Sequence, residues 1–452
     1  MRNNFLRTAV YTVGVSVLSV ALAAIAFAPA EKGVKWVSRE AQSAAVFFVE
    51  SITAAQIRSA YHNTQFDDAA LIPLLDPFTP AQSAGGARLP DRQRPTSGGK
   101  VRILIVPGHQ PGKGGTVFEG VWEHEIVVDI ADALAGIMAQ NPHYEGMVAR
   151  TKTAWNPVLS NYFDAHAADI EAFRQSQMLQ MKKYLATGAM LPEADQVYHN
   201  AAPGEAALQL YGINKWASEN EYDIIIHLHI NDERGHRANV AGDDTGFTVY
   251  VPDHQYSNAA ASKAVGEAIA ARLNAYHATS TLPKEDKGVV EDQELIAIGS
   301  NNSVDGAALL IEYGYIYEPQ FLEPSVRAVA VADYAYQTYL GLQDFFNDAP
   351  SATYGSIAFP YDWEKVTAKK DERGPGVYAL QAALRYLGFY PPAGRSFSDC
   401  PVSGKAGTCT RSALMAFQRA NGLAATGTLD PDTRDALFRD TEQSVTFPMS
   451  AK

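Results

Sequence analysis

Short apolar segments alternate with longer segments of helical periodicity over residues 101–345 of this chain. Residues 101–106 form the first apolar run, which Pro107 and Gly108 end, and residues 123–138 place apolar side chains three or four positions apart. Further strands are expected at 223–230, 247–251 and 307–313, and further helices near 206–218 and 258–276. Strands separated by helices predict an α/β fold, with a mostly parallel sheet and helices on both faces.

The N-terminus indicates export. Arg2 and Arg7 precede an uncharged stretch, residues 8–30, that is rich in Val, Leu and Ala. Such a segment is a signal peptide or an N-terminal membrane anchor, and its length favours the anchor slightly. Positive charge on the short N-terminal side places the rest of the chain outside the cytoplasm, in the periplasm or cell envelope. The membrane is then a partner if the segment stays uncleaved.

The domain organisation follows from changes in composition. We expect the segment 1–30, a helical stalk at 31–75, a linker rich in Pro, Gly and Ser at 76–100, the α/β domain at 101–348, a second linker at 349–373, and a mostly helical unit at 374–440. Residues 155–202 interrupt the α/β pattern as an insertion with a helix around 169–185. We hypothesise that this helix covers the cleft and regulates access, and an ordinary surface excursion is the alternative.

Charge and cysteine content exclude several functions. The chain has 37 Lys or Arg against 50 Asp or Glu, a net charge of -13, so it is not a basic nucleic-acid-binding protein. Two cysteines allow neither a disulfide scaffold nor a site of four thiolates. Outside the cytoplasm thiols tend to oxidise, so Cys400 and Cys409 are expected to form a disulfide. Any metal must be held by His and carboxylates.

Four polar residues occupy strand ends or a helix start. His109 follows the first strand, His229 and Glu312 end two later strands, and Glu123 opens the first helix. Sites in open α/β sheets lie at the carboxyl ends of strands. Hydrolytic zinc typically has three protein ligands from His and carboxylate, and a further carboxylate can accept and pass on a proton. One such His would be unremarkable, but the four together favour a metal hydrolase site.

Residues 101–134, VRILIVPGHQPGKGGTVFEGVWEHEIVVDIADAL, resemble the opening of the zinc-dependent N-acetylmuramoyl-L-alanine amidases. Those enzymes begin with an apolar strand, a Gly-His pair, a glycine-rich loop and a Glu that starts a helix. HLHIN at 227–231 and IEYGY at 311–315 resemble the strand ends that carry the second His and the catalytic Glu of that family. The resemblance implies one zinc ion bound by His109, Glu123 and His229, with Glu312 as the catalytic carboxylate.

Three nearby residues leave alternatives. Glu125 competes with Glu123 as a ligand, but Glu123 keeps the helix phase of the family, and residues two apart on a helix face different directions. His124, between them, is expected at the surface. His227 stands where the family usually has Ser, and it shares a strand face with His229. It could stabilise the developing oxyanion as a catalytic residue, or it could be a buried His with hydrogen-bond partners.

The C-terminal unit resembles small three-helix peptidoglycan-binding domains through VYALQAALRYLGF at 377–389, ALMAFQ at 413–418 and TGTLDPDT at 426–433. Together the resemblances imply a cell-wall hydrolase that cleaves the amide between N-acetylmuramic acid and L-alanine of peptidoglycan with a zinc-activated water. A zinc peptidase or carboxypeptidase acting on stem peptides is the alternative enzyme. A non-catalytic wall-binding protein is the alternative from another class. The sequence identifies no protein activator.

Overall fold

The computed structural model describes residues 99–445 except 194–196, 198–201, 203, 236–238, 299–305, 347–365, 367, 370 and 398. The expected N-terminal segment 1–30, the stalk at 31–75, and most of the linkers at 76–100 and 349–373 lie outside the described residues. Within the described part of the chain, no helix combines the length and the apolar character needed to cross a membrane.

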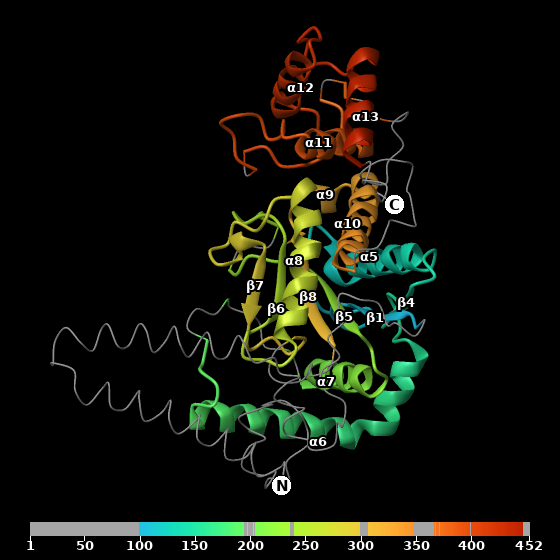
Figure 1. The fold of residues 1–452 in the computed structure, drawn as a ribbon, viewed down its shortest axis with the longest axis vertical. Coiled ribbons are helices and arrows are strands. Elements are labelled where there is room, and N and C mark those ends of the chain that lie inside the picture. Colours follow the sequence, from blue (N-terminus) through green and yellow to red (C-terminus); the bar gives the residue numbers. More distant parts are fainter. Residues whose placement is uncertain are drawn as a thin grey trace, which may run out of the picture. The chain divides into compact units, whose positions relative to one another are not determined.

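A six-stranded sheet in the order β4-β1-β5-β8-β6-β7 forms the centre of the fold (Figure 1). Its strands are β1 (Val101–Pro107), β4 (Tyr144–Val148), β5 (Ile224–Asn231), β6 (Thr248–Pro252), β7 (Val289–Asp292) and β8 (Ala307–Tyr315). β1, β4, β5 and β8 run parallel, whereas β6 pairs with β8 in the antiparallel direction and β7 runs parallel to β6. The prediction of a mostly parallel sheet is confirmed.

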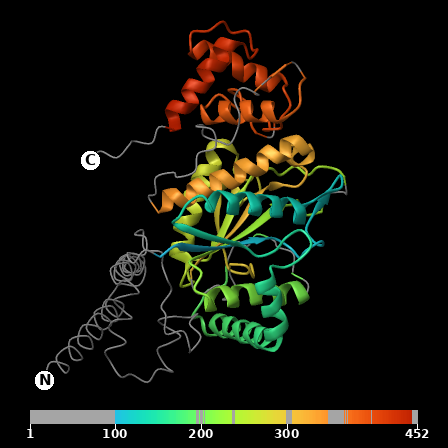
Figure 2. The same cartoon turned by 90° about the vertical axis from the view of Figure 1, so that its right-hand side faces the viewer.

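Helices cover both faces of the sheet, as expected (Figures 1 and 2). One face carries α5 (Glu123–Met138), α8 (Ala259–Tyr276) and α10 (Pro324–Phe345), and the other carries α6 (Pro157–Thr187) and α7 (Gly204–Glu219). Alternate residues along each strand serve the two faces. Ile103, Ile105 and Ile226 thus belong to one apolar core with α5, while Leu104, Val106 and Ile225 belong to a second core with α7.

Several elements differ from the sequence expectations. Helix α5 has the expected bounds, but helix α6 begins at Pro157 rather than near 169, after Asn156 accepts a hydrogen bond from the Val158 amide. Strands β4 and β7 and helix α10 were not expected. The remaining short elements are a hairpin of β2 (Val117–Phe118) and β3 (Val121–Trp122), the 3-10 helix η1 (Glu285–Lys287) and α9 (Pro319–Leu322).

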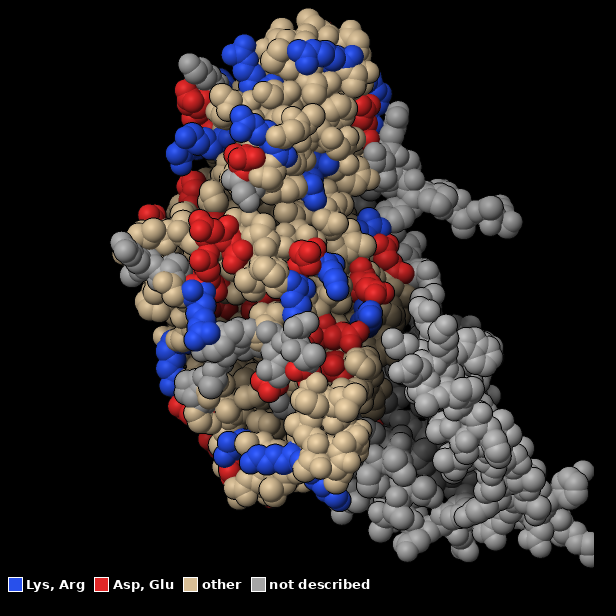
Figure 3. Space-filling model, turned by 90° about the vertical axis from the view of Figure 1, so that its left-hand side faces the viewer, with Lys and Arg blue, Asp and Glu red and all other residues tan. Residues whose placement is uncertain are grey.

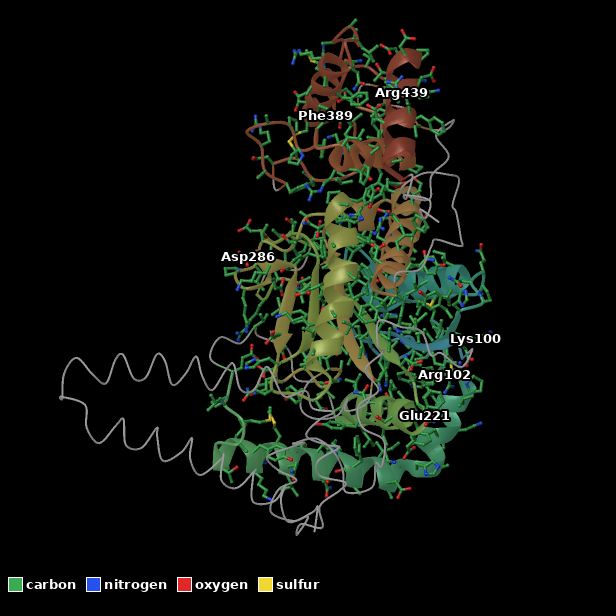
Figure 4. The ribbon with its side chains drawn as sticks, in the orientation of Figure 1. Lys100, Arg102, Glu221, Asp286, Phe389 and Arg439 are labelled. Carbon is green, nitrogen blue, oxygen red and sulfur yellow. A yellow bond between two sulfur atoms is a disulfide. The ribbon has the colours of Figure 1, made fainter. Side chains whose placement is uncertain are left out.

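The C-terminal unit contains α11 (Pro375–Tyr386), α12 (Thr408–Ala420) and α13 (Pro431–Val445). Its core contains Leu380, Leu384, Leu414, Phe417 and Leu437. Cys400 and Cys409 form a disulfide, drawn as the yellow bond in Figure 4, where Phe389 and Arg439 are labelled in the same unit. The Asp430 carboxylate accepts a hydrogen bond from the Thr433 amide at 2.8 Å, which caps α13.

Candidate metal and active site

Three predicted ligands meet at the carboxyl end of the sheet. Their donor atoms, from His109, Glu123 and His229, all lie within 4.8 Å of one another. Nε2 of His109 lies 2.8 Å from Oε2 of Glu123, and Nδ1 of His229 lies 3.0 Å from Oε1 of Glu123. The two imidazole rings are 5.0 Å apart between centroids and meet edge to face. Residues that are far apart in sequence therefore converge on one point.

The glycine-rich loop after β1 makes this convergence possible. His109 itself has a positive φ of 66°, a backbone conformation that residues other than glycine rarely adopt. A Cβ at Gly108 would lie 2.4 Å from the His229 ring, and a Cβ at Gly115 would lie 2.7 Å from Oε2 of Glu123. A Cβ at either position would therefore force the His229 ring or the Glu123 carboxylate to shift, and glycine leaves both side chains in place.

Two backbone amides fix the Glu123 carboxylate. Oε2 accepts from the Thr116 amide at 2.9 Å and Oε1 accepts from the Ile230 amide at 3.1 Å. Burial alone would raise the pKa of Glu123, but its close contacts with the His109 and His229 rings bring it well below its usual value. Glu123 therefore stays ionised, which is the form that binds a metal.

The donor set fits zinc. Nε2 of His109 is buried, and its 2.8 Å ion-pair contact with Oε2 of Glu123 does not have hydrogen-bond geometry. A buried ring nitrogen without a partner carries a free-energy cost that a coordinated metal would remove. Two imidazoles and one carboxylate are ligands that hydrolytic zinc sites use, and they leave one coordination position open.

Glu312 lies directly beside the triad. It is the cross-strand partner of His229 in the β5–β8 pair, so both side chains point to the same face. Oε2 of Glu312 is buried and has no hydrogen-bond partner. Burial raises the pKa of Glu312 well above its usual value, and the carboxylates of Glu123 and Glu285 raise it further. This carboxyl group therefore keeps its proton to a higher pH than an exposed Glu does.

His227 lies on the same strand face as His229, two residues deeper in the sheet. Its cross-strand neighbours are Val106 and Leu310, its side chain is 0% exposed, and neither ring nitrogen has a hydrogen-bond partner. Burial lowers its pKa to about 3, with a smaller effect of His229, so the ring is neutral. The oxyanion-stabilising role of His227 stays a prediction.

The two competing glutamates, Glu123 and Glu125, have different surroundings in the first turn of α5. Glu123 is buried and reaches the two histidines, whereas Glu125 is exposed. The expectation that His124 lies at the surface is wrong, because its side chain is buried and Nδ1 lies 2.9 Å from the Gly114 carbonyl oxygen. The loop from Gly114 to Thr116 folds over this helix turn, and the helical pattern alone did not indicate that cover.

The sequence reasoning missed Arg150, which follows β4. The guanidinium of this buried side chain donates to the carbonyl oxygens of Pro107 and His124, both at 3.1 Å, and to that of Gly108. It thereby joins the end of β1 to the first turn of α5, the two segments next to the predicted ligands His109 and Glu123. A charged residue at the carboxyl end of a predicted strand would have been the signal, but β4 was not predicted.

Glu285 was also missed. It is 1% exposed and begins η1, next to Asp286, which is labelled in Figure 4. Its carboxylate accepts hydrogen bonds from the hydroxyls of Tyr250 and Tyr315, the latter at 3.3 Å. It is thus a further buried carboxylate close enough to influence Glu312. No local motif marks it, because its hydroxyl partners come from β6 and β8.

The described residues contain a second group of possible metal ligands, which are Asp253, His254 and Glu291. Its His254 is largely exposed, and Glu291 already pairs with Lys263 at 3.0 Å. On the face drawn in Figure 3, basic side chains are scattered among acidic ones and form no continuous basic stripe.

Comparison with known proteins identifies two domains. A family model described as N-acetylmuramoyl-L-alanine amidase matches residues 103–343, more than half of the chain. A second model, described as a putative peptidoglycan binding domain, matches residues 373–437. No curated protein matches the chain.

Several solved structures are similar to the chain. The N-acetylmuramyl-L-alanine amidase Ami1 from Mycobacterium smegmatis has 14% sequence identity and a TM-score of 0.35, with 55% of this chain and 98% of that chain covered. The amidase AmiC2 of Nostoc punctiforme has 13% identity and a TM-score of 0.33, with 55% and 98% covered. The catalytic domain of CwlV from Bacillus (Paenibacillus) polymyxa var. colistinus has 13% identity and a TM-score of 0.32, with 55% and 99% covered.

Proposed function

Because the chain belongs to the family of N-acetylmuramoyl-L-alanine amidases, we propose that His109, Glu123 and His229 bind one zinc ion and that Glu312 is the catalytic carboxylate. The chain is a peptidoglycan amidase, which hydrolyses the amide between N-acetylmuramic acid and L-alanine. The observation that carries the proposal for the site is the approach of three metal-binding donors to within 4.8 Å, on the same sheet edge as Glu312.

The arrangement assigns separate tasks to the residues. A zinc ion, when bound, would polarise the scissile carbonyl and lower the pKa of a water molecule. Glu123 and the two histidines would hold that ion, while the Thr116 and Ile230 amides keep the Glu123 carboxylate in place. Glu312 would accept a proton from the attacking water and give it to the nitrogen of the departing L-alanine. His227 would help to stabilise the negative charge that develops on the carbonyl oxygen of the substrate.

The other parts of the chain would bring this site to its substrate. The C-terminal domain would bind peptidoglycan and raise the local concentration of substrate around the catalytic domain. A peptidoglycan amidase acts outside the cytoplasm. We propose that residues 1–30 export the chain to the periplasm as a signal or anchor, and that an uncleaved segment would hold it at the membrane.

A digest of purified peptidoglycan tests the proposal. A protein of residues 99–452 is incubated with peptidoglycan in the presence of zinc or of a chelator. The Glu312→Ala variant is incubated with zinc in the same way, and all products are identified by mass spectrometry. Free stem peptides that begin with L-alanine are expected, and they should disappear with the chelator and with the substitution. Shortened peptides that remain attached to sugar would favour the peptidase alternative, and intact wall would favour a non-catalytic wall-binding protein.

A matched pair of variants tests the metal ligand. Glu123 and Glu125 lie in the same helix turn, but only Glu123 contacts the two histidines. Glu123→Ala should abolish zinc binding and turnover, whereas Glu125→Ala should retain both. Equal zinc affinities of the two variants, measured by competition with a chromogenic chelator, would contradict the ligand assignment.

A further inference from the structure

Three neighbouring strands bring buried polar atoms without hydrogen-bond partners to one region of the sheet. These atoms belong to His227 on β5, Glu312 on β8 and Thr248 on β6. Oε2 of Glu312 and Oγ1 of Thr248 each lack a partner, and so do both ring nitrogens of His227. Thr248 is 0% exposed. Thr248 has no role in the site described above.

The strand register places Thr248 directly opposite Glu312. The two residues are cross-strand partners in the antiparallel β6–β8 pair, so their side chains leave the sheet on the same face. Directly opposed residues have Cβ atoms about 5 Å apart, which is within reach of a hydroxyl–carboxylate hydrogen bond. On the other side of β8, His229 occupies the equivalent position opposite Glu312.

The other two buried carboxylates of this region already have hydrogen-bond donors. Glu123 accepts from two backbone amides, and Glu285 accepts from the Tyr250 and Tyr315 hydroxyls. Oε2 of Glu312 has none, and the unpaired hydroxyl beside it is that of Thr248. A buried hydroxyl without a partner destabilises the fold, and valine would fill the same space without that cost. A hydrogen bond between Thr248 and Glu312 would remove the free-energy cost of both unpaired groups.

We propose that Thr248 is a positioning residue whose hydroxyl donates a hydrogen bond to the Glu312 carboxylate in the working enzyme. The bond would hold the carboxylate in one rotamer, turned toward the substrate and the triad. The inference rests on the proposed role of Glu312 and extends it to a residue on a third strand. Since Thr248 acts through Glu312, its removal should affect the rate of the chemical step more than substrate binding.

The first test compares three variants of the full chain loaded with zinc. Thr248→Val should lower kcat on purified peptidoglycan by about 10- to 100-fold with KM unchanged, as removal of supporting hydrogen bonds around metal sites typically does. Thr248→Ser keeps the hydroxyl and should restore most of the rate. Thr245→Val is the matched control, because Oγ1 of Thr245 is also buried without a partner but lies outside the β6–β8 pair. An unchanged kcat in Thr248→Val, or an equal loss in Thr245→Val, would overturn the inference.

The second test does not depend on turnover. Urea unfolding midpoints are measured for the wild type, Thr248→Val, Glu312→Gln and the double variant, all saturated with zinc. If the two side chains interact, Thr248→Val shifts the midpoint differently in the wild-type and Glu312→Gln backgrounds. Equal shifts would refute the contact. If the wild type cleaves no peptidoglycan, the proposed function fails, and this cycle still decides whether Thr248 and Glu312 interact.

Discussion

Gly115→Ala should weaken zinc binding through a defined clash. The new Cβ would lie 2.7 Å from Oε2 of Glu123 and 2.8 Å from Cδ2 of His109. Ordinary carbon contacts begin near 3.5 Å, so the two ligands must move by about 0.8 Å. Zinc–ligand distances vary by only about 0.2 Å between sites. We therefore expect the substitution to lower zinc affinity at least about 10-fold, which corresponds to about 1.4 kcal/mol.

Gly120→Ala separates this clash from backbone strain. Gly115 and Gly120 have almost the same positive φ, 77° and 78°, but a Cβ at Gly120 would have no neighbour within 4 Å. Both variants therefore bear the cost of a left-handed alanine, roughly 1–2 kcal/mol of unfolding free energy. Only the Gly115 variant should also lose zinc affinity.

The assay is competition for zinc with a chromogenic chelator, together with thermal unfolding of the metal-free proteins. Similar melting temperatures for the two variants would show that strain is matched. Equal zinc affinities of Gly115→Ala and Gly120→Ala would refute the reasoning, because the added Cβ at position 115 would then not displace the ligands.

Three further predictions concern residues around the site. Arg150→Met should lower the unfolding free energy by about 2–4 kcal/mol in urea titrations, because it leaves buried carbonyls such as that of Pro107 without donors; a loss under about 1 kcal/mol would contradict this. Glu312→Gln should stabilise the metal-free protein increasingly as pH rises above about 4.5. The raised folded pKa of Glu312 means that the unfolded chain binds fewer protons there, so wild-type stability falls by up to about 1.4 kcal/mol per pH unit until the folded pKa is passed. A pH-independent difference in urea midpoints would disprove it. Deletion of residues 169–185 should raise the turnover of purified wall fragments if α6 restricts access, and unchanged turnover would refute that hypothesis.

The fold was predictable where one face of an element is polar or where a strand is a continuous apolar run. Helix α5 and strand β1 have such patterns, and the structure places both where they were expected. Helix α10 was missed because it is buried almost all round, which removes the polar stripe by which a helix is recognised. Strand β4 is an edge strand with a glycine in its middle, so its apolar run is too weak to stand out.

The proposed metal ligands could be singled out from the sequence because each lies at a strand end or opens a helix. The residues that support them could not, because their partners come from other elements. Arg150 donates hydrogen bonds to carbonyl oxygens more than 20 residues away in the sequence. Thr248 is brought opposite Glu312 only by the register of the β6–β8 pair. Local sequence carries the first kind of information, whereas the second depends on how the strands pair.

The buried charges themselves explain why this arrangement calls for a cation. Burial raises the pKa of Glu312, and the nearby carboxylates of Glu123 and Glu285 raise it further, while the neighbouring ring of His227 is neutral. Like charges in a desolvated site cannot all ionise without a counter-charge. A divalent ion held by the triad would supply it, and would favour the carboxylate form of Glu312. Metal binding and the readiness of Glu312 to accept a proton are therefore coupled, so the metal-free protein should lack both parts of the catalytic apparatus at once.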